Sequence, residues 1–172
     1  MIRRALPKDI EGIEKVAEAA RAFLKANGSR QWQDGYPFRE DFLRDIEKEA
    51  LFVFEEDGEI LGTVSLQKEE DENYAEIFEG KWLNEEPYVA VHRLAVLKQG
   101  GGVGRKLLGF AEEYARKEGF RNLRCDTTEE NQVMHHLLNG LGYQRCGIIY
   151  LKRTPVHNKR VAYQKVLQKA TN

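Results

Sequence analysis

The stretch that decides the fold runs from position 91 to 105 and reads Val-His-Arg-Leu-Ala-Val-Leu-Lys-Gln-Gly-Gly-Gly-Val-Gly-Arg. Its first part, up to Val96, is rich in apolar and β-branched residues and predicts a buried strand. The glycines after Gln99 predict a loop, and apolar residues at helical spacing from Val103 onward predict that the loop opens a helix. The first turn of a helix has unpaired N–H groups and the positive end of the helix dipole. This junction is therefore suited to bind a phosphate anion.

Glycine suits such a loop because an anion must touch the backbone, and a Cβ atom would hold it away. Two other glycine-rich signatures do not fit. The dinucleotide pattern G-x-G-x-x-G requires a third glycine where Arg105 stands. A P-loop ends in Gly-Lys-Ser/Thr, whereas Gly104 is followed by Arg105, Lys106 and Leu107.

The pattern that fits is (Gln/Arg)-x-x-Gly-x-(Gly/Ala), met by Gln99, Gly102 and Gly104. In this strand–loop–helix context it resembles the signature of the GNAT superfamily. The similarity is good over residues 88–145, including Asn131 and a Gly-Tyr ending at Tyr143, and the N-terminal third is similar only in element order. The resemblance implies an α/β (α+β) fold, in which a mixed, mostly antiparallel central sheet of about seven strands is flanked by about four helices.

The resemblance also implies an N-acetyltransferase that moves the acetyl group of acetyl-CoA to a primary amine of a small molecule by direct attack, without a metal. The pyrophosphate would lie on the backbone of residues 100–105, the pantetheine arm beside residues 94–96, and a backbone N–H there would polarise the acetyl carbonyl. The residues implied to bind acetyl-CoA are Leu94, Ala95, Val96, Gln99, Gly100, Gly101, Gly102, Val103, Gly104, Arg105 and Asn131.

His92 is the candidate base that deprotonates the amine. Strand alternation places it on the face of Leu94, and arylalkylamine acetyltransferases, which resemble this segment, carry a histidine at the matching position. The alternative is a half-buried structural histidine. The catalytic acid is less defined, because Leu138 occupies the position where the family usually has a tyrosine. Tyr150 is the candidate, with another residue or solvent as alternatives; Tyr143 is a poor candidate, because it matches the structural aromatic that follows glycine in the family.

Three aromatic residues are candidates for the walls of the acceptor pocket, namely Trp32, Tyr36 and Trp82. Plain core positions are the alternative for the two tryptophans. The segment 68–87 is acidic and would attract a cationic amine, although a solvated acidic face explains most of its carboxylates better.

The remaining elements follow from periodicity and turn residues. We expect helices after Asp9, near 38–46 with Phe38, Phe42, Leu43 and Ile46 on one side, and near 134–141. Asp57-Gly58 predicts a type I′ hairpin between strands near 51–54 and 60–66. Further strands are expected near 2–6, 123–127, 143–151 and 161–167.

Two cysteines do not make a disulfide framework. In the fold that the sequence resembles, the last strand lies between those of Cys125 and Cys146, so we expect free thiols. His135, His136 and His157 are expected to be exposed, and no third ligand for a metal converges on them.

The 172 residues suit one domain, 1–172, and 41% hydrophobic residues suffice for a core. With 27 basic and 28 acidic residues the formal net charge is −1, which gives no general attraction to nucleic acid, and no basic, aromatic-bearing patch stands out in the sequence. We find no signal peptide and no membrane-spanning run, and therefore expect a cytoplasmic protein without a membrane partner. A homodimer, a peptide N-terminus as acceptor, and a non-catalytic acyl-CoA sensor all remain open.

Overall fold

The computed structural model describes residues 1–168 and forms two compact units. The first unit comprises Met1–Gln67 and Val91–Ala111, and the second comprises Lys68–Ala90 and Glu112–Asn172, of which 169–172 lie outside the described residues. The single domain expected over 1–172 stays a prediction.

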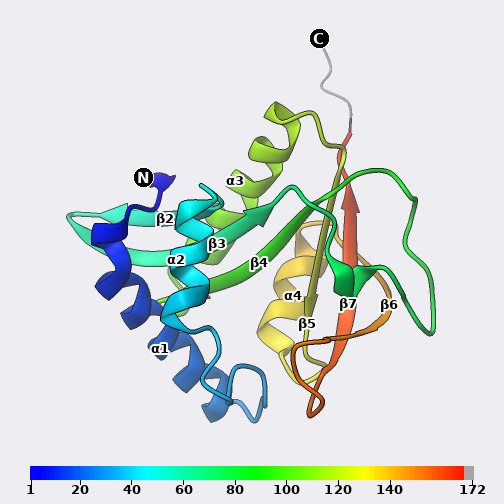
Figure 1. Cartoon of the computed structure of the whole chain (residues 1–172), viewed down its shortest axis with the longest axis horizontal. Coiled ribbons are helices and arrows are strands. Elements are labelled where there is room, and N and C mark those ends of the chain that lie inside the picture. Colours follow the sequence, from blue (N-terminus) through cyan, green and yellow to red (C-terminus); the bar gives the residue numbers. More distant parts are fainter. Residues whose placement is uncertain (169–172) are drawn as a thin grey trace. The chain divides into compact units, whose positions relative to one another are not determined.

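Seven strands of the described chain pair in the order β1-β2-β3-β4-β5-β7-β6, with β4 contributing to both units (Figure 1). Their bounds are β1 (Ile2–Arg4), β2 (Leu51–Glu56), β3 (Glu59–Gln67), β4 (Val89–Val96), β5 (Asn122–Thr127), β6 (Gln144–Tyr150) and β7 (Lys159–Val166). The pairs β1–β2, β2–β3, β5–β7 and β6–β7 are antiparallel, and β4–β5 is parallel. Together with helices α1 (Ile10–Ala26), α2 (Arg39–Glu47), α3 (Val103–Lys117) and α4 (Gln132–Gly140), this confirms the expected mixed, mostly antiparallel architecture.

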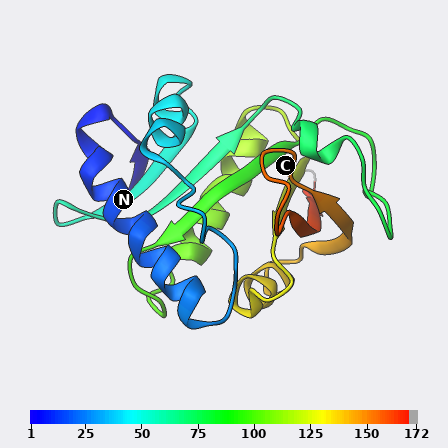
Figure 2. The same ribbon diagram turned by 60° about the horizontal axis from the view of Figure 1, so that its bottom comes forward.

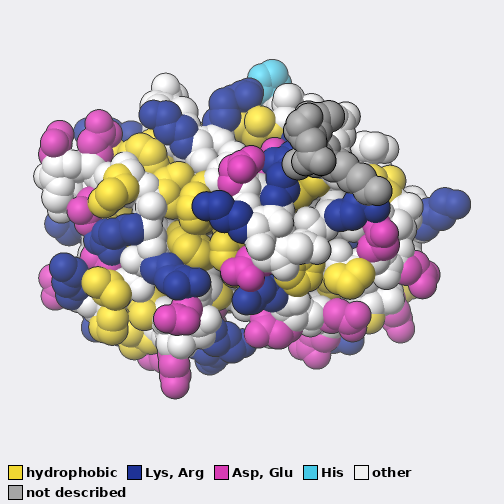
Figure 3. Space-filling model, turned by 90° about the horizontal axis from the view of Figure 1, so that it is seen from above, with side chains coloured by type: hydrophobic (Ala, Val, Ile, Leu, Met, Phe, Trp, Pro, Cys, Tyr) yellow, Lys and Arg dark blue, Asp and Glu magenta, His cyan; other side chains and the backbone are white. Residues whose placement is uncertain are grey.

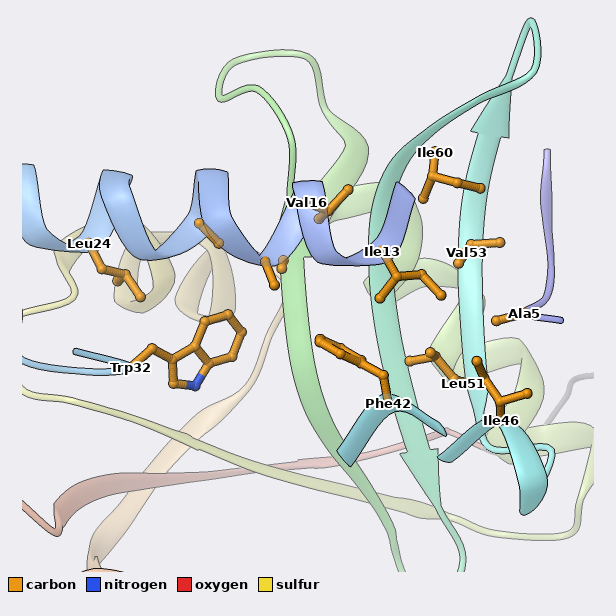
Figure 4. Close-up of a cluster of buried hydrophobic side chains, with 13 residues drawn as sticks. Ala5, Ile13, Val16, Leu24, Trp32, Phe42, Ile46, Leu51, Val53 and Ile60 are labelled. Atoms are coloured by element: carbon orange, nitrogen blue, oxygen red, sulfur yellow. The ribbon is translucent and has the colours of Figure 1, made fainter. Parts of the chain in front are cut away.

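In the first unit, α1 and α2 cover one face of the sheet and α3 covers the other (Figures 1 and 2). Strand β2 is buried on both faces, which is why its sequence is apolar from Leu51 to Phe54. Leu51 and Val53 join the cluster beneath α1 and α2, which Figure 4 shows. Phe52, on the opposite face, packs against Phe110 of α3 with ring centroids 4.9 Å apart.

Two local predictions for the first unit have different outcomes. The hairpin at Asp57-Gly58 is confirmed as type I′, since both residues have positive φ, 51° and 79°. The expectation that Phe38 and Leu43 lie on the buried side of the second helix is wrong, because they are 50% and 39% exposed. Phe38 precedes the helix in an extended conformation, and the buried residues of the helix are Phe42, Asp45 and Ile46.

In the second unit, β7 lies between β5 and β6. Cys125 on β5 pairs with Tyr163 of β7, while Cys146 lies on β6, and both cysteines are buried free thiols, as expected. Burial raises the pKa of both thiols.

No helix within residues 1–168 is long and apolar enough to cross a membrane. Basic and acidic side chains are interspersed over the face of the molecule shown in Figure 3.

Candidate active site

The glycine-rich loop between β4 and α3 exposes its backbone. Gly100 and Gly102 have φ of +84° and +76°, a region that residues with a Cβ rarely adopt. A Cβ built on Gly100, Gly101 or Gly102 would have no heavy atom within 4 Å. The turn of the loop therefore depends on backbone conformations that glycine allows. Its main chain is accessible to a ligand.

Helix α3 begins at Val103, directly after this loop, and Lys106 N donates to Gly102 O at 3.1 Å to start the helical hydrogen bonds. The N–H groups of the first turn, before Lys106, form the positive end of the helix dipole. Gln99 and Arg105 are exposed beside it. Backbone donors, an amide and a guanidinium together fit a diphosphate anion.

Gly62 of β3 fixes the position of this turn, and sequence reasoning missed it. A Cβ on Gly62 would lie 2.7 Å from Val103 Cγ1, 2.9 Å from Leu107 Cδ1 and 3.1 Å from the Ala95 carbonyl oxygen. The start of α3 thus rests directly on the sheet. The available signal was an isolated glycine within a strand pattern, which often marks a close approach.

Strand β4 contains an irregularity at Arg93, whose φ is +50°. The expectation that His92 shares a face with Leu94 rested on regular alternation, which a left-handed residue between them interrupts. His92 and Leu94 are both half-buried. The irregularity lies next to the backbone of residues 94–96, where the acetyl carbonyl was expected.

The side chain of Arg93 connects three elements of the first unit. It forms a bidentate ion pair with Asp45 of α2, at 2.5 Å (Nε to Oδ2) and 2.8 Å (Nη2 to Oδ1). Its Nη1 donates to the hydroxyl of Tyr36, in the loop between α1 and α2. Burial acts to lower the pKa of Arg93, but Tyr36 and Asp45 raise it above the ordinary arginine value.

Trp32 and Tyr36 differ in exposure. Trp32 is 8% exposed and belongs to the cluster beneath α1, as Figure 4 shows, which favours the alternative of a core residue. Tyr36 is half-buried and meets Trp32 edge-on, with centroids 6.3 Å apart. Tyr36 is thus the better candidate for a pocket wall.

Trp82, in the second unit, is part of an aromatic cluster with a cation. The Cζ atom of Arg124 lies 4.1 Å from the ring centroid of Trp82 and 4.3 Å from the ring centroid of Tyr88. The indole N–H donates to the Tyr74 carbonyl at 3.0 Å, and the Tyr74 hydroxyl donates to Asp126 at 2.6 Å. Burial raises the pKa of Tyr74 and lowers that of Arg124. The nearby glutamates between residues 69 and 86 are exposed, in accord with a solvated acidic face.

Asn131 and Tyr150 also belong to the second unit. Asn131 is the N-cap of α4, where its side-chain oxygen accepts from Met134 N at 3.2 Å and its amide donates to Thr127 Oγ1 at 3.1 Å. Tyr150 is 43% exposed and packs edge-on against Phe78. Leu138, at the position where the family usually has a tyrosine, is fully buried and offers no hydroxyl for proton transfer.

The histidine predictions need one correction. His136 and His157 are exposed as expected, but His135 is buried. Its Nε2 donates to the Thr128 carbonyl at 3.0 Å, which leaves Nδ1 to accept from the Tyr163 hydroxyl at 2.6 Å. Within residues 1–168 there is no group of three or more His, Cys, Asp or Glu side chains placed to hold a metal ion.

Comparison with known proteins places these features in a family. The model of the acetyltransferase (GNAT) family matches residues 15–143. An uncharacterized N-acetyltransferase, YesJ of Bacillus subtilis (strain 168), is 27% identical over 147 residues, covering 83% of this chain and 81% of YesJ.

Two solved structures are similar over nearly the whole chain. A GNAT family acetyltransferase from Streptococcus agalactiae is 39% identical with a TM-score of 0.84, covering 98% of this chain and 96% of that one. YncA from Salmonella typhimurium, a protein solved with acetyl-CoA, has a TM-score of 0.69 at 20% identity, covering 100% of this chain and 96% of its own. The family match and the 39% identical relative lead to one conclusion: the chain belongs to the GNAT family of acetyltransferases.

Proposed function

We propose that this acetyltransferase moves the acetyl group of acetyl-CoA to a primary amine of a small molecule. The observation that carries the proposal is the glycine loop, whose backbone has nothing within 4 Å of any Cβ position from Gly100 to Gly102 and leads into the first turn of α3. YncA of Salmonella typhimurium was solved with acetyl-CoA as its cofactor, which supports the same ligand here.

Different residues of the first unit bind the pyrophosphate, the pantetheine arm and the acetyl group. Backbone N–H groups of the loop and of the first turn of α3 hold the pyrophosphate, and Gln99 and Arg105 add side-chain donors. The edge of β4 from Leu94 to Val96 pairs with the pantetheine arm. A backbone N–H near Leu94 or Val96 is aimed at the negative charge that develops on the acetyl oxygen, which stabilises the transition state.

Proton transfer is assigned to two side chains. His92 accepts the proton of the attacking amine, directly or through a water molecule. Tyr150 returns a proton to the departing thiolate, a role that solvent fills if the tyrosine does not reach the sulfur.

The experiment is release of free CoA, followed by a thiol reagent, against a panel of small amines, peptides and antibiotics. Turnover of a small amine supports the proposal. Turnover of peptides alone would assign the protein to peptide N-termini. Calorimetric binding of acetyl-CoA without any turnover would indicate a sensor, and absence of binding would overturn the proposal.

A cytoplasmic location is part of the same proposal. Cys125 and Cys146 are buried free thiols, so the fold does not need an oxidising compartment.

A further inference from the structure

Arg93 adopts a backbone conformation that its own chemistry does not favour. A φ of +50° is unfavourable for a residue with a Cβ, relative to the right-handed or extended regions. Such a conformation persists only where the surroundings determine it. The cause must therefore be found in the contacts of Arg93.

Those contacts act on both its backbone and its side chain. The Thr63 hydroxyl donates to the Arg93 carbonyl at 3.0 Å. The guanidinium meets Asp45 with two hydrogen bonds and Tyr36 with a third. We call this group of Arg93, Asp45 and Tyr36 the Arg93 clamp.

The Arg93 clamp is largely shielded from water, so its ion pair is screened less than an exposed pair. The Asp45 side chain is 3% exposed and that of Arg93 14%. Gln67 also donates to Asp45, at 3.1 Å, which fixes the carboxylate from a second side. Removing one partner of a buried pair leaves an uncompensated charge, which is strongly destabilising. The pair therefore keeps the guanidinium of Arg93 in place, while the Thr63 hydroxyl holds its carbonyl.

We propose that Arg93 is a positioning residue for acetyl transfer, because the clamp sets the direction of the β4 backbone that follows it. Leu94 is the next residue, and its N–H belongs to the peptide group whose carbonyl Thr63 holds. The same clamp anchors Tyr36, so the loop at residues 28–37 and the strand that faces the acetyl group are fixed to one guanidinium. The inference rests on the proposed binding of acetyl-CoA beside residues 94–96.

The test measures how strongly the protein polarises the carbonyl of bound acetyl-CoA. Acetyl-CoA labelled with ¹³C at the acetyl carbonyl is bound to the wild type and to the variants Arg93→Ala, Arg93→Lys and Tyr36→Phe. In the wild type we expect a downfield shift of the carbonyl resonance relative to free acetyl-CoA. In Arg93→Ala the resonance returns toward the free value, while the Kd stays within about threefold because the phosphate contacts are unchanged.

Lysine cannot form the planar bidentate pair, so Arg93→Lys is expected to recover only part of the shift. Tyr36→Phe removes a single hydrogen bond and keeps the ring, and it provides a milder variant if Arg93→Ala does not fold. Arg3→Ala is the matched control, since Arg3 makes a bidentate pair with Asp9 and a further bond to Glu55 away from the loop. It should lower the unfolding midpoint and leave the carbonyl resonance unchanged.

A wild-type carbonyl shift in every folded Arg93 and Tyr36 variant would overturn the positioning role and make the clamp purely structural. If the wild type itself binds acetyl-CoA without shifting the carbonyl, the positioning inference also fails. If the wild type does not bind acetyl-CoA, the proposed function fails first, which separates the two failures.

Discussion

His92 is half-buried on β4 and directly precedes the left-handed residue Arg93. Regular alternation therefore does not define the direction of its imidazole. Its proposed role as base rests on its place beside residues 94–96 and on the suitability of histidine for proton transfer near neutrality.

His92→Gln keeps a polar side chain of similar length and removes the proposed base. We expect the rate of acetyl transfer to fall by roughly 10²–10⁴-fold, with a flattened acid limb in the pH–rate profile. The Kd for acetyl-CoA should barely change. His136→Gln, at an exposed histidine of α4, is the control and should keep the full rate.

A near-normal rate and an unchanged acid limb in His92→Gln would make His92 structural. The base would then have to be sought among Glu79, Glu85 and an ordered water.

The burial and the contacts of single side chains were the hardest features to predict from the sequence. His135 looked exposed because nothing near it in sequence indicates a partner, but Tyr163, 28 residues away, supplies one. Arg93 gave no signal of a left-handed backbone, because its cause lies in Asp45 and Tyr36, which are 48 and 57 residues distant.

At the scale of elements, the contact between β3 and α3 holds the proposed binding loop in position. Gly62 lets Val103 and Leu107 approach the strand, as the short distances from its Cβ position show. Since Val103 is the first residue of α3, any displacement there moves the loop as well.

Gly62→Val should push α3 away from the sheet. We expect a loss of about 1–3 kcal/mol in the free energy of unfolding, because one of the close atoms is a backbone oxygen that cannot rotate away. The affinity for acetyl-CoA should fall with it. Denaturant unfolding and calorimetry measure the two effects.

Gly109→Ala is the matched control on α3 itself. A Cβ at Gly109 meets nothing within 4 Å, so alanine should stabilise the helix by about 0.5–1 kcal/mol and leave binding intact. Full stability in Gly62→Val would mean that the helix does not depend on this contact.

The elements themselves were largely predictable, because their signals are local. Asp57-Gly58 fixed a hairpin and the glycines before Val103 fixed a helix start, each by the conformations that those residues allow. The exposure of Phe38 and Leu43 was not predictable in this way, since it depends on how much of α2 the sheet can cover.

For the whole molecule, stability in acid depends on carboxylates that are paired in the folded state. The hydrogen bond from Arg3 holds the pKa of Asp9 below its ordinary value, and Asp9 is 7% exposed. A carboxylate with a lowered folded-state pKa stabilises the fold above its unfolded pKa of about 3.9, and this contribution is lost as the pH falls through the folded value.

Asp9→Asn should therefore lower the free energy of unfolding at neutral pH by roughly 1–3 kcal/mol. Its difference from the wild type should shrink as the pH drops below about 4, where the wild-type carboxylate takes up its proton. Thermal unfolding between neutral and acidic pH measures this, with Glu56→Gln, at an exposed carboxylate, as control. A difference that is constant with pH would show that Asp9 does not contribute through its charge.

The mixed, mostly antiparallel sheet and the family were predictable for the chain as a whole, because one motif in its strand–loop–helix context restricts the fold strongly. The acceptor was not predictable, because long-range packing places the candidate residues of its pocket. Tyr36, for example, is placed by Arg93 and by Trp32.

The central claim is that acetyl-CoA binds to the open backbone of the glycine loop, and calorimetric titration of two leucine variants tests it most directly. Gly102 and Gly58 have nearly equal φ, +76° and +79°, and a Cβ at either position meets nothing within 4 Å. Each leucine variant thus carries a similar backbone cost, and only the one at position 102 fills the space of the pyrophosphate. We predict that Gly102→Leu loses acetyl-CoA binding while Gly58→Leu keeps it. Undiminished binding to folded Gly102→Leu would contradict the account.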